Sequence, residues 1–431
     1  NYTLKERSFM SGRKRRFYTI QVERNKRTWD CETETMPEPD EIVLLVPQYL
    51  GDTSKVIVEE GSYVVVGQRI ADSMEAMPLH SAVSGTVEEI AEVRVRGNDR
   101  RTAVRIVSDG KQKISEKVEI PEIETKKAYI DCIRRAGIFN GRTPAYIDFN
   151  REDVRTIYVN GLETEPVVTA GHRIMLEDAE DIADGIALTM KYLEADKAVV
   201  CIAASDTEAA EIMGEAAHMH SGIYIKTVKD KYIPDNREIL EYELTGEEDN
   251  SEVLFSDIRA MAQIGSYFRT GMPVVSQKIT VDGDIIAEPK NVLVPIGTRI
   301  AAVADFCGGY TSTPRKIIDN GTMTGRCFSS DRLPVCKDTR AIVAFEGKDS
   351  VMPDVEHCIR CGSCYRNCPE GLTPVYIAKA YARGDIKNLR IFDVTKCISC
   401  GCCSYICPAK IPLQQICLEA GRMVREVEKD V

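Results

Sequence analysis

The sequence CIRCGSCYRNCP at residues 358–369 returns as CISCGCCSYICP at residues 397–408, and both copies follow the pattern C-x2-C-x2-C-x3-C-P. This pattern is typical of bacterial ferredoxins that hold two [4Fe–4S] clusters. Two residues between successive cysteines allow a tight turn to place three thiolates at three corners of a cube. The fourth cysteine follows one turn later, beside a proline, and in two-cluster proteins it binds the other cube. The sequence therefore predicts a domain with two [4Fe–4S] clusters.

The spacing also predicts which cysteines bind each cluster. The predicted ligands of cluster 1 are Cys358, Cys361, Cys364 and Cys407, and those of cluster 2 are Cys397, Cys400, Cys403 and Cys368. Zinc is the alternative, because paired CxxC motifs also bind zinc. A zinc ion needs only four ligands and has no use for the extra C-x2-C step or the proline, so the spacing favours clusters.

Length and composition limit the class of protein. A chain of 431 residues is too long for one hydrophobic core, so several domains are expected. No apolar run reaches the roughly 18 residues of a membrane-spanning helix, and the first residues lack the apolar segment of a secretory signal. Thiolate clusters are typical of a reducing compartment, so we expect a cytoplasmic protein. The net charge of −11 argues against nucleic acid as a partner.

Positive charge is concentrated at the amino terminus. Residues 1–27 contain nine Lys or Arg and two Glu, a net charge of +7, which leaves −18 for the remainder of the chain. We expect residues 1–36 to form a basic arm that packs on the acidic body of the chain. The alternative is that the run Arg13–Arg16 docks on an acidic protein or a membrane surface.

Residues 37–115 are expected to form a β-rich domain, because short alternating apolar runs are separated by glycines. The pattern resembles the barrel-sandwich domains of biotinyl and lipoyl carriers. A carrier has a lysine at the hairpin tip, whereas here Glu75-Ala76-Met77 is followed by Pro78, which has no amine. We therefore expect the fold without the carrier chemistry. His80, beside the tip, is expected to be a packed residue rather than a ligand.

The middle of the chain, residues 116–265, alternates between helix and strand patterns. Helices are expected over 126–138 and 173–193, and strands over 153–159 and 198–203. This alternation predicts βαβ units and a parallel sheet.

Two further regions complete the chain. Residues 266–350 fit a β-grasp-like module of short strands with one helix, and residues 351–431 carry the cluster motifs. The helix-forming composition of 374–382 favours a helical ferredoxin domain. The predicted fold class is thus a multidomain α/β and β protein with a barrel sandwich, an α/β domain, a β-grasp module and a two-cluster domain.

This order of domains resembles the RnfC component of the Rnf electron-transport complex, and also the RnfC-like protein associated with D-proline reductase. The matching stretches include VPQYLGDTSKVIVEEGSYVVVGQRI (46–70), NGLETEPVVTAGHRIMLE (160–177) and ITVDGDIIAEPKNVLVPIGT (279–298). The α/β region is similar to the flavoprotein subunit of respiratory complex I. The resemblance implies a complex-I-flavoprotein-like α/β domain, an SLBB-like β-grasp module and electron transfer through the clusters.

Relatives that hold FMN and oxidise NADH carry a glycine-rich loop in the α/β domain. Here the same place reads AGIFNGRTP (136–144), which is shorter and lacks the adjacent glycine pair. Flat cofactors and phosphates need backbone that no Cβ obstructs. The resemblance therefore implies only a degenerate flavin or NADH site, with the residues Gly137, Gly141, Arg142, Glu163 and Glu165. For Arg142 the alternatives are crowding the cofactor or pairing with a phosphate, and for the two glutamates the alternative is capping the turn.

The remaining cysteines give weaker signals. Cys402 is expected to face away from its cube, and Cys417 to be a packing residue. Cys327 and Cys336 are expected to be buried free thiols, with a redox-active dithiol as the alternative.

We predict an iron–sulfur electron-transfer protein that passes single electrons through two [4Fe–4S] clusters between a redox donor and a partner reductase or complex. The alternative is an NADH dehydrogenase module in which FMN in the α/β domain feeds the clusters. The predicted partners are redox proteins, and the alternative adds NADH. A cytoplasmic location is expected, with peripheral attachment to a membrane complex as the alternative. The sequence does not identify the donor, the acceptor or the direction of flow.

Overall fold

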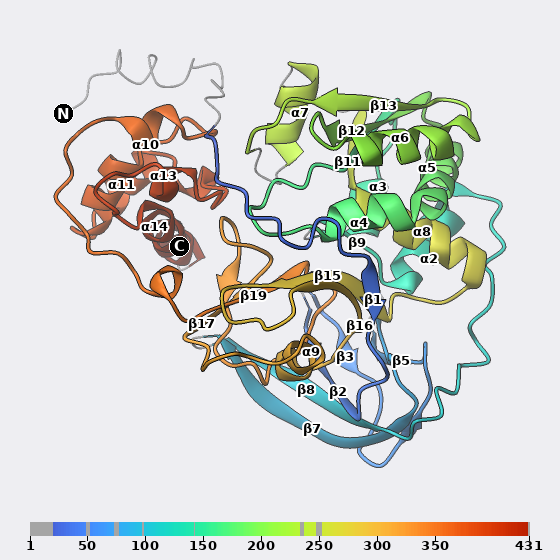
Figure 1. Ribbon diagram of the computed structural model, residues 1–431. Coiled ribbons are helices and arrows are strands. Elements are labelled where there is room, and N and C mark those ends of the chain that lie inside the picture. Colours follow the sequence, from blue (N-terminus) through green and yellow to red (C-terminus); the bar gives the residue numbers. More distant parts are fainter. Residues whose placement is uncertain are drawn as a thin grey trace.

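The computed structural model of the chain describes residues 20–48, 52–72, 77–96, 99–141, 143–232, 237–246 and 252–429. Figure 1 shows them as a barrel sandwich, an α/β domain, a sheet module between these two and a helical domain at the carboxyl terminus. The run Arg13–Arg16, the tip residues Glu75 and Ala76, and Arg142 lie outside the described residues.

The barrel sandwich consists of two antiparallel sheets, with strand orders β2-β8-β7-β4 and β3-β5-β6. The strands are β2 (Glu41–Val46), β3 (Lys55–Val56), β4 (Tyr63–Val64), β5 (Arg69–Asp72), β6 (Leu79–His80), β7 (Gly85–Arg96) and β8 (Asp99–Ser108). Side chains alternate along a strand, so Ile42 and Leu44 of β2 share one core with Val104 of β8. Gly85 must be glycine, because a Cβ there would lie 1.9 Å from the carbonyl oxygen of Val107.

The α/β domain contains a parallel sheet of four strands in the order β13-β12-β11-β14. These strands are β11 (Thr156–Asn160), β12 (Lys197–Ala203), β13 (Ile223–Val228) and β14 (Val253–Asp257). The helices are α2 (Lys126–Ala136), α3 (Ala145–Phe149), α4 (Ala170–Glu177), α5 (Ala179–Leu193), α6 (Thr207–His218), α7 (Arg237–Thr245) and α8 (Ile258–Thr270), and a hairpin of β9 (Phe139–Asn140) and β10 (Thr143–Pro144) follows α2. The predicted parallel sheet is confirmed.

The prediction of one long helix over 173–193 is wrong, because the chain forms α4 and α5 with a break at Asp178. Asp178 has φ −119° and ψ 25°, outside the helical region. The ammonium of Lys278 lies 2.9 Å from the Glu177 carboxylate and 2.8 Å from that of Asp178. The break therefore carries an ion-paired contact to the neighbouring module, which the helical period of the sequence does not reveal.

Helices α5 and α8 pack at two glycines. A Cβ on Gly185 would lie 2.1 Å from the carbonyl oxygen of Met261, and one on Gly265 would lie 1.9 Å from that of Asp181. The two helix backbones are thus in direct contact, at a separation that no larger residue would allow.

The sheet module has six strands in the order β1-β16-β15-β19-β17-β18. They are β1 (Thr33–Thr35), β15 (Ser276–Asp282), β16 (Lys290–Pro295), β17 (Lys316–Asp319), β18 (Arg326–Cys327) and β19 (Ala341–Phe345), with helix α9 (Ile300–Phe306). Strand β1 runs parallel to β16, with Thr33 opposite Asn291. The amino-terminal segment was expected to pack on the body of the chain, and residues 20–36 do so, but the strand that they contribute was not predicted.

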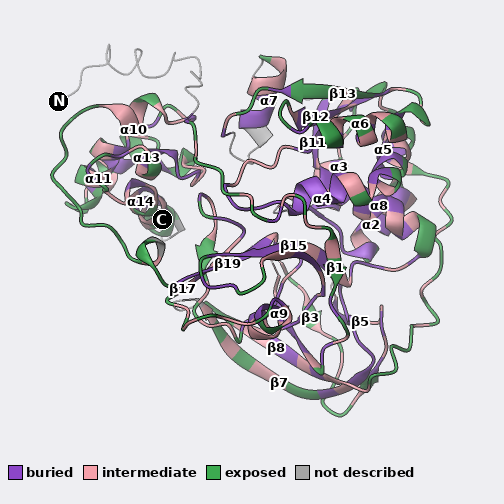
Figure 2. Ribbon diagram, in the orientation of Figure 1, coloured by how far each residue is buried: buried purple, intermediate pink, exposed green. Residues whose placement is uncertain are grey.

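The carboxyl-terminal domain is helical, as predicted. It contains α10 (Ser363–Arg366), α11 (Pro374–Tyr381), α12 (Ile386–Ile391), α13 (Cys402–Tyr405) and α14 (Leu413–Lys429), with 3-10 turns η1 (Lys348–Ser350) and η2 (Val394–Lys396). Its small core includes Leu372, Ile377, Leu389 and Val424. The segment that leads into it, residues 351–361, is exposed throughout (Figure 2).

Candidate metal centre

Each cysteine motif folds into a turn followed by one turn of helix. The turn ends at a left-handed glycine, Gly362 with φ 74° before α10 and Gly401 with φ 81° before α13. Arg360 and Ser399 also have positive φ values, of 58° and 52°. Such a turn curls the backbone around a common point, which turns the thiols of one motif toward the same space.

The first motif brings together the set predicted for cluster 1. Burial raises the pKa of Cys364, and the adjacent thiols of Cys407, Cys358 and Cys361 raise it further, so these four side chains lie near one another. Cys358 and Cys361 are exposed, whereas Cys407 is buried. The predicted site of cluster 1 is therefore at the protein surface.

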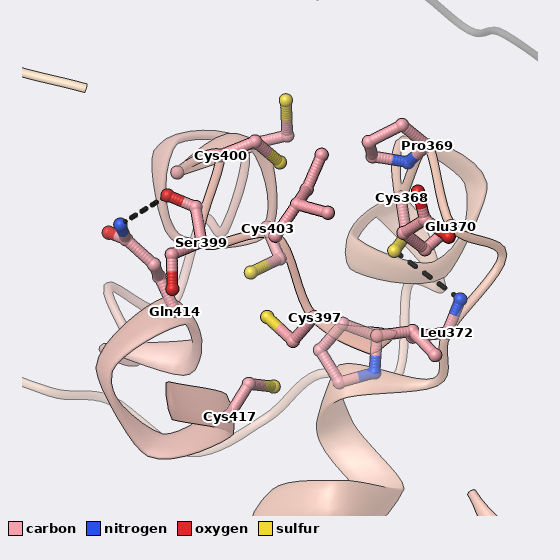
Figure 3. A pocket seen from close by; sticks show the side chains of 14 residues that line it. Cys368, Pro369, Glu370, Leu372, Cys397, Ser399, Cys400, Cys403, Gln414 and Cys417 are labelled. Atoms are coloured by element: carbon pink, nitrogen blue, oxygen red, sulfur yellow. Dashed lines mark hydrogen bonds between the residues drawn. The ribbon is translucent and has the colours of Figure 1, made fainter. Parts of the chain in front are cut away.

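The set predicted for cluster 2 lines a cavity that encloses about 350 Å³ of unfilled space, part of it open to solvent. Figure 3 shows the sulfurs of Cys368, Cys397 and Cys403 turned toward this space. Burial raises the pKa of Cys403, as do the neighbouring thiols of Cys400, Cys368 and Cys397. Cys368 comes from the first motif, so the structure places the fourth cysteine of that motif beside the second set.

The donor set fits a cluster better than a single ion. Among the residues that the structure describes, no three His, Cys, Asp or Glu side chains group closely enough to hold one metal ion. Zinc would need four ligands at about 2.3 Å from one centre. A cube spreads its four thiolates over four iron atoms, which allows the wider spacing seen here. We conclude that both cysteine sets fit [4Fe–4S] clusters, and their roles as ligands remain a prediction.

Two further thiols lie beside the second set, and the sequence predicted no role for either. The Cys417 thiol donates a hydrogen bond to Cys397, which lowers the pKa of Cys397 to about 7, and this bond together with burial raises the pKa of Cys417. Cys402, which was expected to face away, lines the same cavity and hydrogen-bonds to Cys400. Their positions outside the C-x2-C pattern gave no signal.

The second set is covered by other parts of the chain. Ile20, Tyr232 and Met323 form one apolar cluster with Cys400 and Cys402. The Tyr232 hydroxyl donates to the backbone carbonyl of Cys400 at 2.8 Å. Since Tyr232 follows β13, the predicted site of cluster 2 faces the α/β domain, away from the exposed first set.

The glycines of the predicted flavin site lie in closed surroundings. Gly137 ends α2 with φ 73°, and its carbonyl accepts a hydrogen bond of 3.0 Å from the ammonium of Lys337. Gly141 forms the turn of the hairpin β9–β10, and the Arg340 guanidinium lies 3.7 Å from the place of a Cβ there. Arg340 is paired at 2.6 Å with Asp257, at the carboxyl end of β14.

Lys337 joins three parts of the molecule. Its side chain is 2% exposed, and its ammonium donates to the carbonyl of Pro78 at 3.1 Å as well as to that of Gly137. Burial lowers the pKa of Lys337 to about 7. The contact fixes the barrel tip, where carriers have their lysine, against the α/β domain.

The predicted glutamates are bound to the chain itself. Glu163 accepts from the backbone N–H of Gly171 at 3.0 Å. Glu165 accepts from the backbone N–H groups of Met323 and Thr324, both at 2.9 Å, and burial raises its pKa. Both carboxylates therefore cap turns, which is the alternative that the sequence left open.

The amino-terminal segment packs beside these glutamates. The indole of Trp29 stacks on the imidazole of His172 at 3.8 Å, and His172 is hydrogen-bonded at 2.9 Å to Asp206, which follows β12. The Lys26 ammonium donates to the carbonyls of Glu163 and Val168 at 3.0 and 2.6 Å. Parallel sheets bind ligands outside the carboxyl ends of their strands. There this chain places its own rings and ion pairs, so the described residues do not fit a flavin.

Other candidates have structural surroundings. His80 is buried, as expected, and burial keeps its pKa well below the usual value. Cys327 is exposed, contrary to expectation, whereas Cys336 packs against Val43 and Leu45 of the barrel sandwich. Both thiols are free.

Comparison with family profiles divides the chain as the fold does. Residues 19–111 match the RnfC barrel sandwich hybrid domain, 140–265 the Nuo51 FMN-binding domain, 278–326 the SLBB domain and 350–408 the 4Fe-4S dicluster domain. The predicted fold class is confirmed, and the dicluster match supports the predicted iron–sulfur clusters.

Relatives match over most of the chain, and each is the RnfC component of a larger complex. The one from the proton-translocating ferredoxin:NAD(+) oxidoreductase complex of Clostridium ljungdahlii is 32% identical over 81% of this chain and 80% of its own. The one from the Na(+)-translocating ferredoxin:NAD(+) oxidoreductase complex of Acetobacterium woodii is 30% identical over 79% and 81%. The one from the ion-translocating oxidoreductase complex of Rhodobacter capsulatus is 31% identical over 84% and 73%.

Among solved structures, a chain of an NAD+-reducing [NiFe]-hydrogenase in the H2-reduced state aligns with a TM-score of 0.50 at 15% identity. The alignment covers 70% of this chain and 61% of the hydrogenase chain. At this identity the likeness concerns the fold alone.

Proposed function

Because this chain belongs to the RnfC family, as its sequence predicted, we propose that it is an iron–sulfur electron-transfer protein. Single electrons pass through two [4Fe–4S] clusters between a redox donor and an acceptor protein. The clusters supply one-electron storage, and the chain holds and insulates them.

The observation that carries the proposal is the sorting of the eight motif cysteines into two sets, with Cys368 beside the second set and Cys407 beside the first. The crossing of the fourth cysteines places both clusters on one small helical domain. The surface position of Cys358 and Cys361 supports cluster 1 as the site of exchange with a partner protein.

The partners follow from the relatives, which are components of ferredoxin:NAD(+) oxidoreductase complexes. We propose that this chain also works within a complex of redox proteins, attached peripherally on the cytoplasmic side of a membrane. In the described part of the chain, no helix is long and apolar enough to cross a bilayer.

The test is iron and acid-labile sulfide analysis of the full chain purified without oxygen. Two cubes require about eight irons per chain. Cys364→Ala is expected to lose about half of this iron, and Cys307→Ala, a buried cysteine of the sheet module, is the matched control and should retain it all. Wild-type protein with markedly less iron, or a C364A variant with full iron content, would contradict the proposal.

A second candidate is an NADH dehydrogenase module with FMN in the α/β domain. The match of residues 140–265 to an FMN-binding domain favours it. The packing of Trp29 and His172 and the Arg340–Asp257 pair argue against it. Denatured protein that releases stoichiometric yellow FMN, together with bleaching of the clusters by NADH, would select this candidate.

A further inference from the structure

We propose that Cys417 and Cys402 are hydrogen-bond donors to the ligands of cluster 2 and raise its reduction potential. The inference rests on the proposed function, because it requires clusters on the predicted ligands. It assigns a role to two cysteines that are no part of either C-x2-C-x2-C-x3-C-P motif.

Cys417 is held rigidly against the second set. It lies on α14, is 1% exposed and packs beside Cys397 and Cys368. Figure 3 shows its sulfur on the side of Cys397. One turn earlier on the same helix face, Gln414 donates its side-chain amide to the carbonyl of Ser399 at 2.7 Å. This bond ties α14 to the motif and fixes the distance between the Cys417 and Cys397 sulfurs.

Cys402 meets a different ligand of the same set. Its thiol is 5% exposed, hydrogen-bonds to Cys400 and is enclosed by the apolar side chains of Ile20 and Met323. The two donors therefore reach two of the four predicted ligands, from two elements, in surroundings that exclude water.

The first set is not surrounded in this way. Ser363 holds the place that corresponds to Cys402 and hydrogen-bonds to Cys361, but Cys361 is exposed, so water competes for its lone pairs. Ala378 packs against the group that contains Cys364 and Cys407 and has no polar hydrogen to donate.

The physical effect follows from charge. One added electron increases the negative charge on the ligating thiolates, and a hydrogen-bond donor stabilises that charge. A buried donor acts more strongly, because the local dielectric is low. Removal of either thiol should therefore make cluster 2 harder to reduce without changing cluster 1.

The experiment uses the full chain with its clusters, purified without oxygen, and measures both midpoint potentials by EPR-monitored redox titration. The variants are Cys417→Ala, Cys417→Ser, Cys402→Ala and, as a matched buried thiol far from the motifs, Cys307→Ala. C417A and C402A are each expected to keep full iron and to lower the same one of the two potentials. A tenfold shift in the one-electron equilibrium corresponds to about 59 mV, and this is the size expected. C417S retains a donor and should return toward the wild-type value, and C307A should match wild type.

Three results would overturn the inference. Unchanged potentials in C417A and C402A, with iron intact, would show that both thiols only pack. A loss of iron in C417A would make Cys417 a ligand. Equal shifts of both potentials would indicate a general structural change. Wild-type protein without clusters would instead refute the proposed function, so the two failures are distinguishable.

Discussion

Lys337 should make the stability of the protein depend on pH. The folded pKa is about 7 and the ordinary value is 10.5, and the shift is caused by burial. Between these values the unfolded chain binds a proton that the folded chain has released, so stability must rise as pH rises. For one such group the free energy of unfolding should increase by about 2 kcal/mol between about pH 7 and pH 9.

The perturbation is Lys337→Met, which keeps the apolar stem and removes the titrating amine. Its unfolding free energy should lack this rise with pH, while the carbonyls of Pro78 and Gly137 lose their donor at about 1–3 kcal/mol each. Trp29 is the only tryptophan in the chain, so its fluorescence reports unfolding in urea. Lys117→Met, at an exposed lysine, is the control and should keep the wild-type slope. Equal slopes in wild type and K337M would refute the reasoning.

Three other outcomes are expected. Gly185→Ala should lower the melting temperature, by about 2 kcal/mol or more of stability, because the new Cβ would meet Met261, whereas Gly214→Ala, with nothing within 4 Å, should leave it unchanged or raise it; equal effects would contradict the close helix contact. Glu165→Gln should weaken the turn at Met323 by about 1–3 kcal/mol, seen as faster amide hydrogen exchange there, and unchanged protection would remove its capping role. Trp29→Ala should release the amino-terminal segment to proteolysis, by loss of the stacking on His172 worth about 0.5–1.5 kcal/mol and of buried apolar area; unchanged cleavage would show that Lys26 and Thr28 suffice.

Local signals in the sequence were sufficient for the strongest features. The spacing of the eight motif cysteines predicted the two sets that the structure brings together, because a tight turn and a cluster impose a fixed pattern. The alternation of strand and helix patterns predicted the parallel sheet for the same reason, since both are set by neighbours in the chain.

Features that depend on distant contacts were not predictable. Cys417 has no motif around it, and its position beside Cys397 results from the packing of α14. The break at Asp178 coincides with an ion pair to Lys278, a hundred residues later. The flavin loop could be judged degenerate from its missing glycines, but the placement of Trp29 against His172 depends on where the amino-terminal segment crosses the domain.

Strand β1 has a consequence for how the protein can be cut or produced. It covers the open backbone edge of β16, and it is synthesised long before β16 emerges from the ribosome. Removal of the residues up to Met36 would leave a bare row of amide and carbonyl groups along that edge. Such rows recruit strands from other molecules, so shortened versions of this chain should precipitate even though every iron-binding cysteine is present.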